Sequence, residues 1–436
     1  MTAKKILAFF LAFMLALSCI GCGGKDKEKD KEVSSSLEKT EDSSKEETQA
    51  NQETSYDFLA PSTENQNETQ GGAQGGTQGG TQSGGQTNAQ KKPADVKNII
   101  LIIGDGMGAN HIEAAQLATG KKFSFTGWQN TNVNTDSLNG IGEAMVLTDS
   151  AAGATALATG TMTRNGHVGM DSDAKELETI LDLAKSLGKS TGVVTTDYLY
   201  GATPASFSAH VNNRGKSAEI TLSQKSSNVD FLCGLRNDEH YLPYQPQIES
   251  GGYYFSTATP TNSTVNAKQK AYLTLDIEND AANAIRLSKA AELALGFLER
   301  DTDGFVLMIE QAHIDKRAEA NDFSGVVNCV SSLNETVETV MKWAKNRKDT
   351  AVMVVADHET GGLQVSSTTD LGKSYSHPGG NTVFYSFSCY THTQEPIKLF
   401  VYGIKPVFSD FKYYASNDLI KNIDVYKIMQ QSIMSK

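Results

Sequence analysis

The residue with the clearest chemical potential is Ser150, which lies within residues 148–156 (TDSAAGATA). A strand-like run over residues 144–147 precedes it, and an Ala-rich helical pattern follows. A hydroxyl on the first turn of a helix faces unpaired backbone N–H groups and the positive end of the helix dipole, so a phosphate bound there is partly neutralised. An ordinary helix cap is the alternative interpretation, because Asp and Ser are favoured capping residues.

Acidic residues follow three apolar runs that are typical of buried strands. The runs and the residues that end them are 98–103 (NIILII) with Asp105, 305–309 (FVLMI) with Glu310, and 351–355 (AVMVV) with Asp357 and His358. The carboxyl ends of parallel strands meet at one edge of an open α/β sheet, where such sheets place their active sites. Carboxylates and imidazoles bind divalent cations, so this pattern predicts a metal site at that edge.

Two more carboxylates and one histidine extend this set. Asp315 and Glu319 are four residues apart, which puts both side chains on one face of a helix. His392 stands beside another strand candidate, as His358 does. The remaining histidines lack this context and are interpreted as structural or surface residues: His111, His167, His210, His240, His313 and His377.

Several motifs together resemble the alkaline phosphatase family. Their order and rough spacing match as well, and the resemblance spans about residues 96–436. The most specific block is DSAAGATA, which begins at Asp149. The motifs are 103–108 (IGDGMG), 148–160 (TDSAAGATALATG), 202–205 (ATPA), 210–214 (HVNNR), 314–316 (IDK) and 356–358 (ADH).

This resemblance implies metal-dependent hydrolysis of phosphate monoesters through a phosphoserine intermediate, with release of inorganic phosphate. Ser150 would be the nucleophile, Arg214 would grip two phosphate oxygens, and Asp149 would orient that arginine. The implied cofactors are two Zn²⁺ and one Mg²⁺. Their implied ligands are Asp105, Asp357 and His358 for the zinc that activates the serine, Asp315 and His392 for the zinc that faces the leaving group, and Asp105, Thr203 and Glu310 for the magnesium-like site.

Two positions depart from the family pattern. Glu319 stands where relatives have a histidine ligand of the second zinc, and we predict that its carboxylate takes over that role. A carboxylate is harder than imidazole, which leaves the metal at this site open between Zn²⁺, Mn²⁺ and Mg²⁺. Gly201 stands where relatives have an aspartate or histidine near the magnesium-like site, so occupancy there would be less secure. Lys316 matches a residue that some relatives place near the phosphate through water.

The N-terminal region predicts export and anchoring. Two lysines and a short apolar run are typical of a signal peptide, which we place at residues 1–21. Cys22 follows a glycine, as in a bacterial lipoprotein box, and is the predicted lipidated residue, with Cys19 as the alternative. Residues 22–96 hold too few apolar side chains to fold and predict a disordered, low-complexity tether. We therefore expect an enzyme that is lipid-anchored outside the bacterial cell membrane.

Residues 97–436 predict one catalytic domain. Strand candidates at 192–196 and 305–309 each follow a helical apolar stripe, which is typical of an α/β fold. The expected architecture is a three-layer sandwich with a mostly parallel central sheet and helices on both faces, as in alkaline phosphatases. Residues 215–280 are rich in Ser, Asn, Gly and Tyr and are interpreted as an irregular insertion at the pocket rim or an oligomer contact.

Charge and motif content bear on partners and on alternative functions. With 51 acidic and 39 basic residues, the net charge of -12 argues against nucleic acid as a partner. A sulfatase is disfavoured because Ala152 and Ala154 stand where that class needs Pro and Arg. A phosphodiesterase of the same superfamily, and a lipoprotein that binds phosphate or metal without turnover, remain as alternatives. The expected partners are small-molecule phosphomonoesters and the membrane, and a homodimer is left open.

Overall fold

The computed structural model describes residues 96–138, 147–278, 282, 284–406, 408–411 and 419–434. They belong to one unit, Thr87–Lys436. The predicted signal peptide, Cys22 and the predicted tether up to residue 95 lie outside the described residues. The same holds for residues 144–146 of the strand-like run before Ser150, and Leu147, which is described, lies in no strand.

A ten-stranded sheet forms the centre of the described domain. Its strands are β1 (Asn98–Gly104), β2 (Gln129–Asn134), β3 (Ser190–Thr195), β4 (Phe231–Leu235), β5 (Tyr253–Ser256), β6 (Lys270–Leu275), β7 (Phe305–Gln311), β8 (Thr350–Val355), β14 (Ile397–Tyr402) and β15 (Leu419–Lys421). The order across the sheet is β15-β2-β14-β8-β1-β7-β3-β4-β6-β5. Among these strands only β14 is antiparallel to its neighbours, so the sheet is mostly parallel, as predicted.

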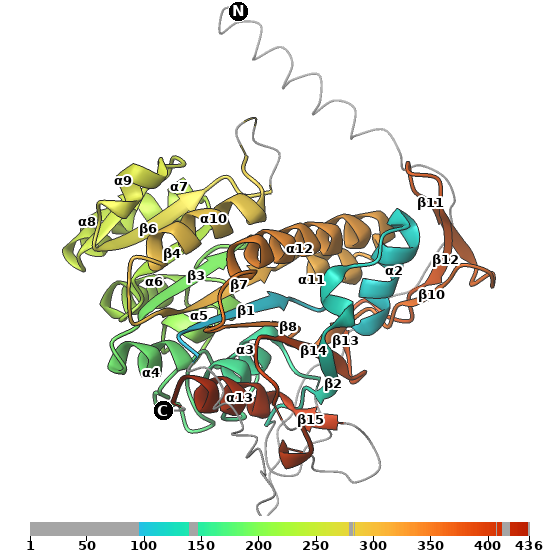
Figure 1. Cartoon of the computed structure of the whole chain (residues 1–436), viewed down its shortest axis with the longest axis horizontal. Coiled ribbons are helices and arrows are strands. Elements are labelled where there is room, and N and C mark those ends of the chain that lie inside the picture. Colours follow the sequence, from blue (N-terminus) through green and yellow to red (C-terminus); the bar gives the residue numbers. More distant parts are fainter. Residues whose placement is uncertain are drawn as a thin grey trace, which may run out of the picture. The chain divides into compact units, whose positions relative to one another are not determined.

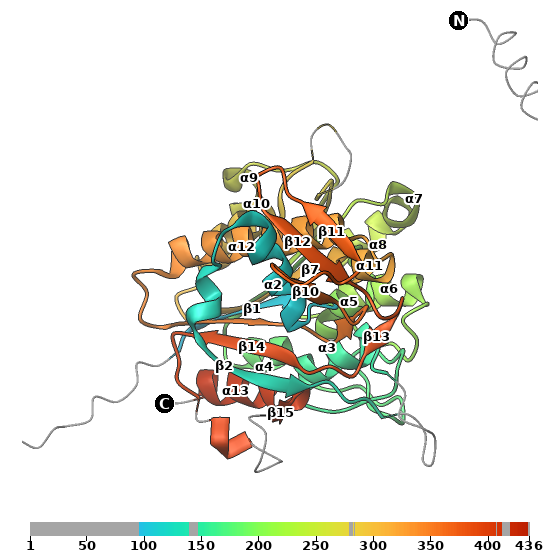
Figure 2. The same cartoon turned by 90° about the vertical axis from the view of Figure 1, so that its right-hand side faces the viewer.

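Helices cover both faces of this sheet, as Figures 1 and 2 show. One face carries α2 (Ala109–Thr119), α10 (Leu287–Leu298), α11 (His313–Glu319) and α12 (Phe323–Ala344). The other carries α3 (Ser150–Thr159), α4 (Ile180–Ser186), α5 (Ala202–Ser208) and α13 (Asn422–Met434). The predicted three-layer α/β architecture is therefore confirmed.

The central strands are apolar because both of their faces are covered. Every residue of β1, β7 and β8 is buried. A parallel strand between two helical layers has no solvent-exposed face, so its sequence is a continuous apolar run and does not alternate between apolar and polar residues. The first polar side chains after each run therefore emerge at the carboxyl edge of the sheet, where water can enter.

The segment 215–280 corrects one prediction, because it is regular and not irregular. It contains α6 (Ser217–Ser226), α7 (Asp238–Tyr241), α8 (Gln245–Ser250) and α9 (Asn262–Asn266), and its strands β4, β5 and β6 extend the central sheet. Three of its tyrosines are core residues: Tyr241 and Tyr253 each pack edge-on against Tyr272. Their hydroxyls are hydrogen-bonded, which makes burial of such polar rings affordable.

Smaller elements complete the domain. They are the 3₁₀ turns η1 (Ser124–Gly127), η2 (Leu242–Tyr244) and η3 (Phe408–Phe411), the two-stranded pair of β9 (Glu359–Thr360) and β13 (His392–Thr393), and a three-stranded sheet of β10 (Gln364–Ser366), β11 (Lys373–Ser376) and β12 (Thr382–Ser386). Within the described part of the chain, no helix has the length and apolar character needed to cross a membrane.

Gly153 generates a prediction about how α3 packs on the sheet. A Cβ at this position would lie 2.7 Å from the carbonyl oxygen of Asp357, so α3 sits too close to the end of β8 for any side chain. We expect Gly153→Ala to destabilise the protein by roughly 1–3 kcal/mol through overpacking, although Ala is the better helix former. The midpoint of urea unfolding measures this change.

Gly296 in α10 is the matched control. A Cβ there would meet nothing closer than 4.0 Å, so Gly296→Ala should be neutral or stabilising by up to about 1 kcal/mol. Equal shifts of the two midpoints would contradict the close packing of α3 on Asp357.

Candidate active site

The carboxyl ends of three neighbouring strands bring the predicted acidic residues together. Ile103 of β1 pairs with Glu310 of β7 on one side and with Val355 of β8 on the other. Adjacent strands lie about 4.8 Å apart, so Asp105, Glu310 and Asp357 emerge at one edge within reach of one another. The sequence predicted this edge from the three apolar runs alone.

Ser150 is the first residue of α3 and is buried. The cap of this helix is Asp149, whose Oδ1 accepts a hydrogen bond from the N–H of Ala152 at 2.9 Å. The capping role therefore belongs to Asp149, and the Ser150 hydroxyl is left for another partner. Its Oγ lies 3.3 Å from Nε2 of His358.

Asp105, Asp357 and His358 form a first cluster whose ligand atoms all lie within 4.8 Å of one another. His358 Nε2 is 3.5 Å from Oδ1 of Asp105 and 3.5 Å from Oδ2 of Asp357. Both of these carboxylate oxygens are buried and have no hydrogen-bond partner among the described residues. Buried polar atoms are rarely left unpaired, so this donor set fits a divalent cation.

Asp315, His392 and the same His358 form a second cluster. His392 Nε2 lies 3.5 Å from Oδ1 of Asp315, and the rings of His358 and His392 stack with centroids 3.6 Å apart. The Nδ1 of His392 donates to the carbonyl oxygen of Thr148 at 2.7 Å, since a carbonyl can only accept. This fixes the tautomer and turns the Nε2 lone pair toward Asp315.

Glu319 lies at the C-terminal end of α11 and belongs to neither cluster as the structure stands. Its side chain is exposed. Partial burial, followed by the nearby Asp315 carboxylate, raises its pKa, whereas His392 and Arg214 act to lower it. Its carboxylate is therefore close enough to interact electrostatically with Asp315 and His392 of the second cluster.

The predicted phosphate-binding residues lie beside Ser150. Nη1 of Arg214 is 3.1 Å from Oδ2 of Asp149, which also accepts a hydrogen bond from the N–H of Gly166 at 3.0 Å. Burial acts to lower the pKa of Arg214, but the attraction of Asp149 outweighs it and raises that pKa. The guanidinium is thus held near the serine, and 41% of its side chain is exposed for a ligand.

The third predicted set, Asp105, Thr203 and Glu310, also converges. Glu310 accepts a short hydrogen bond from the hydroxyl of Thr195. The buried Thr203 hydroxyl is near enough to lower the pKa of Glu310, yet within the described residues it has no hydrogen bond of normal geometry. An unpaired buried hydroxyl beside the Glu310 carboxylate fits a site for a hard cation such as Mg²⁺.

Two features of this edge were not predicted from the sequence. His358 is common to both clusters, and Asp197, which follows β3, forms an ion pair with Lys316 at 3.0 Å. The rule that found Asp105, an acidic residue just after a buried strand, applies equally to Asp197. The sharing of His358 by the two clusters could not be predicted, because it depends on the pairing of β13 with β9, which are distant in sequence.

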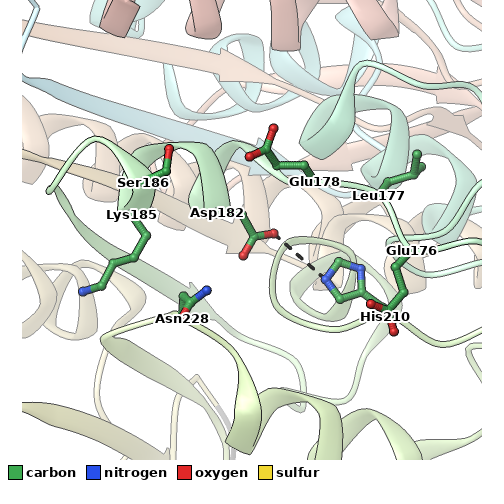
Figure 3. Close-up of a pocket in the computed structure, with 8 residues that line it drawn as sticks. All are labelled: Glu176, Leu177, Glu178, Asp182, Lys185, Ser186, His210 and Asn228. Carbon is green, nitrogen blue, oxygen red and sulfur yellow. Dashed lines mark ion pairs between the residues drawn. The ribbon is translucent and has the colours of Figure 1, made fainter.

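A cavity of about 570 Å³ lies elsewhere, beside α4 (Figure 3). Within the described residues, its lining includes Glu176, Glu178 and Asp182 but none of the predicted site residues. Nε2 of His210 points toward Oδ2 of Asp182 at 4.0 Å. The excess of carboxylates makes this cavity a poor place for a phosphate, which favours the edge beside Ser150.

Comparison with known proteins identifies the family. The family model described as alkaline phosphatase matches residues 96–233 and 269–430, which is more than half of the chain. The chain belongs to the alkaline phosphatase family. Alkaline phosphatase 4 of Bacillus subtilis is 31% identical over 305 residues, which cover 63% of this chain and 64% of that protein. The chain thus spans just under two thirds of that relative's length.

Other alkaline phosphatases agree with this assignment. The Escherichia coli enzyme is 30% identical over 336 residues, covering 61% of this chain and 70% of that enzyme. The solved structure of alkaline phosphatase from the Antarctic bacterium TAB5 superposes with a TM-score of 0.67 at 27% identity and covers 78% of this chain and 98% of that one. The fold of the described domain is therefore that of an alkaline phosphatase.

The buried carboxyls predict how stability depends on pH in protein stripped of cations. Burial raises the pKa of Asp357 to about 7 and that of Glu310 to about 8. Unfolding returns both to ordinary values near 4, so between about pH 4 and 8 these two groups bind more protons in the folded state than in the unfolded state. Their contribution to the free energy of unfolding must then fall as the pH rises through this window. Burial lowers the pKa of His111 and His358, which therefore act in the opposite direction below about pH 6.5. Urea midpoints in EDTA should therefore decrease from pH 7 to pH 8.

Cation binding should reverse this trend, because it displaces the same protons. Glu310→Gln cannot titrate and is the matched variant, which should flatten part of the decrease in EDTA. A midpoint that stays level or rises with pH in the chelated wild type would contradict the assignment of raised pKa values to this cluster.

Proposed function

We propose that this protein hydrolyses phosphate monoesters through a covalent phosphoserine at Ser150 and releases inorganic phosphate. The observation that carries the proposal is the position of the Ser150 hydroxyl, on the first turn of α3 and 3.3 Å from the imidazole that both carboxylate clusters share. A protein that only stored phosphate or metal would not need a hydroxyl there, free of any capping role. Membership of the alkaline phosphatase family supports the same reaction.

The protein's own groups prepare the phosphoryl group for attack. The backbone N–H groups at the start of α3 and the Arg214 guanidinium face the phosphate oxygens and neutralise their charge. Asp149 serves both, because it caps the helix with one oxygen and holds Arg214 with the other. Ser150 is thereby aligned with the phosphorus, and after transfer the same groups hold the phosphoserine for hydrolysis.

We propose that two Zn²⁺ and one Mg²⁺ are the cofactors. Asp105, Asp357 and His358 would hold one zinc, Asp315 and His392 with Glu319 the second metal, and Asp105, Thr203 and Glu310 the magnesium. When bound, such cations lower the pKa of the attacking hydroxyl and neutralise charge on the leaving group. A solved variant of the TAB5 enzyme has Mg bound in a site named M3, which supports a magnesium site here.

The nucleophile assignment predicts the outcome of Ser150→Ala. Loss of the attacking hydroxyl should reduce turnover of an aryl phosphate by roughly 10³-fold or more. Wild-type protein incubated with phosphate at acidic pH and digested should yield a phosphopeptide that contains Ser150, and the variant should not. Ser250→Ala changes an exposed serine in α8 and should leave both readouts unchanged. Near-normal activity in Ser150→Ala would overturn the assignment.

The proposal that Glu319 is a metal ligand has its own test. Its spacing from Asp315 places both carboxylates on one helix face, and an empty site would leave them repelling each other. We expect Glu319→Ala to lose close to one metal per chain and most of its activity, whereas Glu319→His should retain zinc. Glu113→Ala, an exposed change on α2, is the control. Full metal content and turnover in Glu319→Ala would show that Glu319 is only a solvated side chain.

We also propose that Cys22 carries a lipid that anchors the enzyme outside the cell membrane. Support comes from the apolar run that precedes it and the polar segment that follows it. In a bacterium that processes lipoproteins, Cys22→Ser should lose radioactive palmitate labelling and move the enzyme from the membrane to the medium. Retention in Cys22→Ser together with loss in Cys19→Ser would move the anchor to Cys19.

A further inference from the structure

Gly201 has no room for a side chain. It is the residue before α5, and a Cβ there would lie 2.9 Å from Oδ2 of Asp197 and 2.9 Å from the carbonyl oxygen of Tyr198. The family resemblance predicted that a glycine at 201 would leave this part of the site without a side chain. The structure shows that a carboxylate from four residues earlier already occupies the space.

Asp197 is tied to the third set of predicted ligands through its backbone. Its N–H donates to the hydroxyl of Thr195 at 2.8 Å, and that hydroxyl donates to Glu310. The Asp197 carboxylate is also near enough to Glu310 to raise its pKa, second only to burial. Asp197 thus faces the carboxylate edge and not bulk solvent, and only 20% of its side chain is exposed.

The two oxygens of Asp197 face different groups. Oδ2 faces the backbone at Gly201, and Oδ1 lies 3.0 Å from Nζ of Lys316. Burial acts to lower the pKa of Lys316, but the attraction of Asp197, then of Glu310 and Asp105, outweighs it. The ammonium therefore stays charged, and it is near enough to interact electrostatically with Glu310 and Asp105, two residues that would hold the third cation.

We propose that Asp197 is a positioning residue that replaces, from another place in the chain, the side chain missing at Gly201, and that it holds Lys316 where its ammonium can reach a bound phosphate. The inference rests on the proposed function, since it assumes a phosphate beside Ser150. Without Asp197, the carboxylates that still attract Lys316 include Glu310 and Asp105, so the ammonium would move toward the cation site and away from the phosphate. An exposed ion pair without such a role contributes little.

A double-mutant cycle with Asp197→Asn and Lys316→Met tests this coupling. Calorimetry on the full-length, metal-loaded protein gives the dissociation constant of inorganic phosphate for the wild type, each single variant and the double variant. Elemental analysis gives the zinc and magnesium content of the same samples. Glu292→Gln, which breaks an exposed ion pair with Lys289 on α10, is the matched control and should leave phosphate affinity unchanged.

We expect each single variant to weaken phosphate binding by roughly three- to tenfold, as for loss of one partly exposed charged contact. In the Lys316→Met background, Asp197→Asn should have no further effect. The direction of the change in phosphate affinity of Asp197→Asn is informative, because removal of a negative charge by itself would strengthen binding of an anion. We also expect Asp197→Asn to lower magnesium content, since the released ammonium would compete for Glu310, and this loss should be absent in the double variant.

Three results would overturn the inference: tighter phosphate binding in Asp197→Asn, unchanged binding in Asp197→Asn, or the same fold-change in both backgrounds. A wild type that binds phosphate but forms no phosphoserine would refute the proposed function. The double-mutant cycle would still measure the coupling between Asp197 and Lys316, because it depends only on phosphate binding. A wild type that binds no phosphate would overturn both.

Discussion

The constraint on which this structure depends is the repulsion between carboxylates that are buried at one edge of the sheet. Asp105, Asp315, Glu310 and Asp357 act on one another strongly enough that the pKa of Asp105 rises well above its ordinary range, with burial as the larger cause. Apolar strands and helices that cover both faces of the sheet hold them there. The packing of the rest of the fold therefore offsets the free-energy cost of burying these carboxylates close together. Divalent cations are the ligands that relieve their repulsion.

The side chains proposed as metal ligands are oriented by groups outside the proposed ligand sets. The Thr360 hydroxyl donates to Asp315 at 2.5 Å, the Thr148 carbonyl oxygen sets the tautomer of His392, and Thr195 holds Glu310. Such contacts restrict ring and carboxylate orientation before any ligand arrives. They also connect segments that are distant in sequence, because these three threonines come from β9, the segment before α3 and β3.

The segment between the two parts of the family match lies away from this edge. The family model leaves out residues 234–268, which contain α7, α8, β5 and α9. β5 adds an outer strand beside β6, at the side of the sheet far from β8. The strands that present Asp105, Glu310 and Asp357 are therefore not its neighbours in the sheet.

The sequence by itself determined the strands with acidic ends, the helix that starts at Ser150 and the family, because each depends on residues adjacent in the chain. Apolar runs report burial, and the first polar residue after a run reports the sheet edge. Only the tertiary structure decided that His358 joins both clusters, that three tyrosines of residues 215–280 are core, and that Asp197 fills the space at Gly201. These outcomes depend on contacts between segments distant in sequence, and neither composition nor periodicity records which distant segments meet.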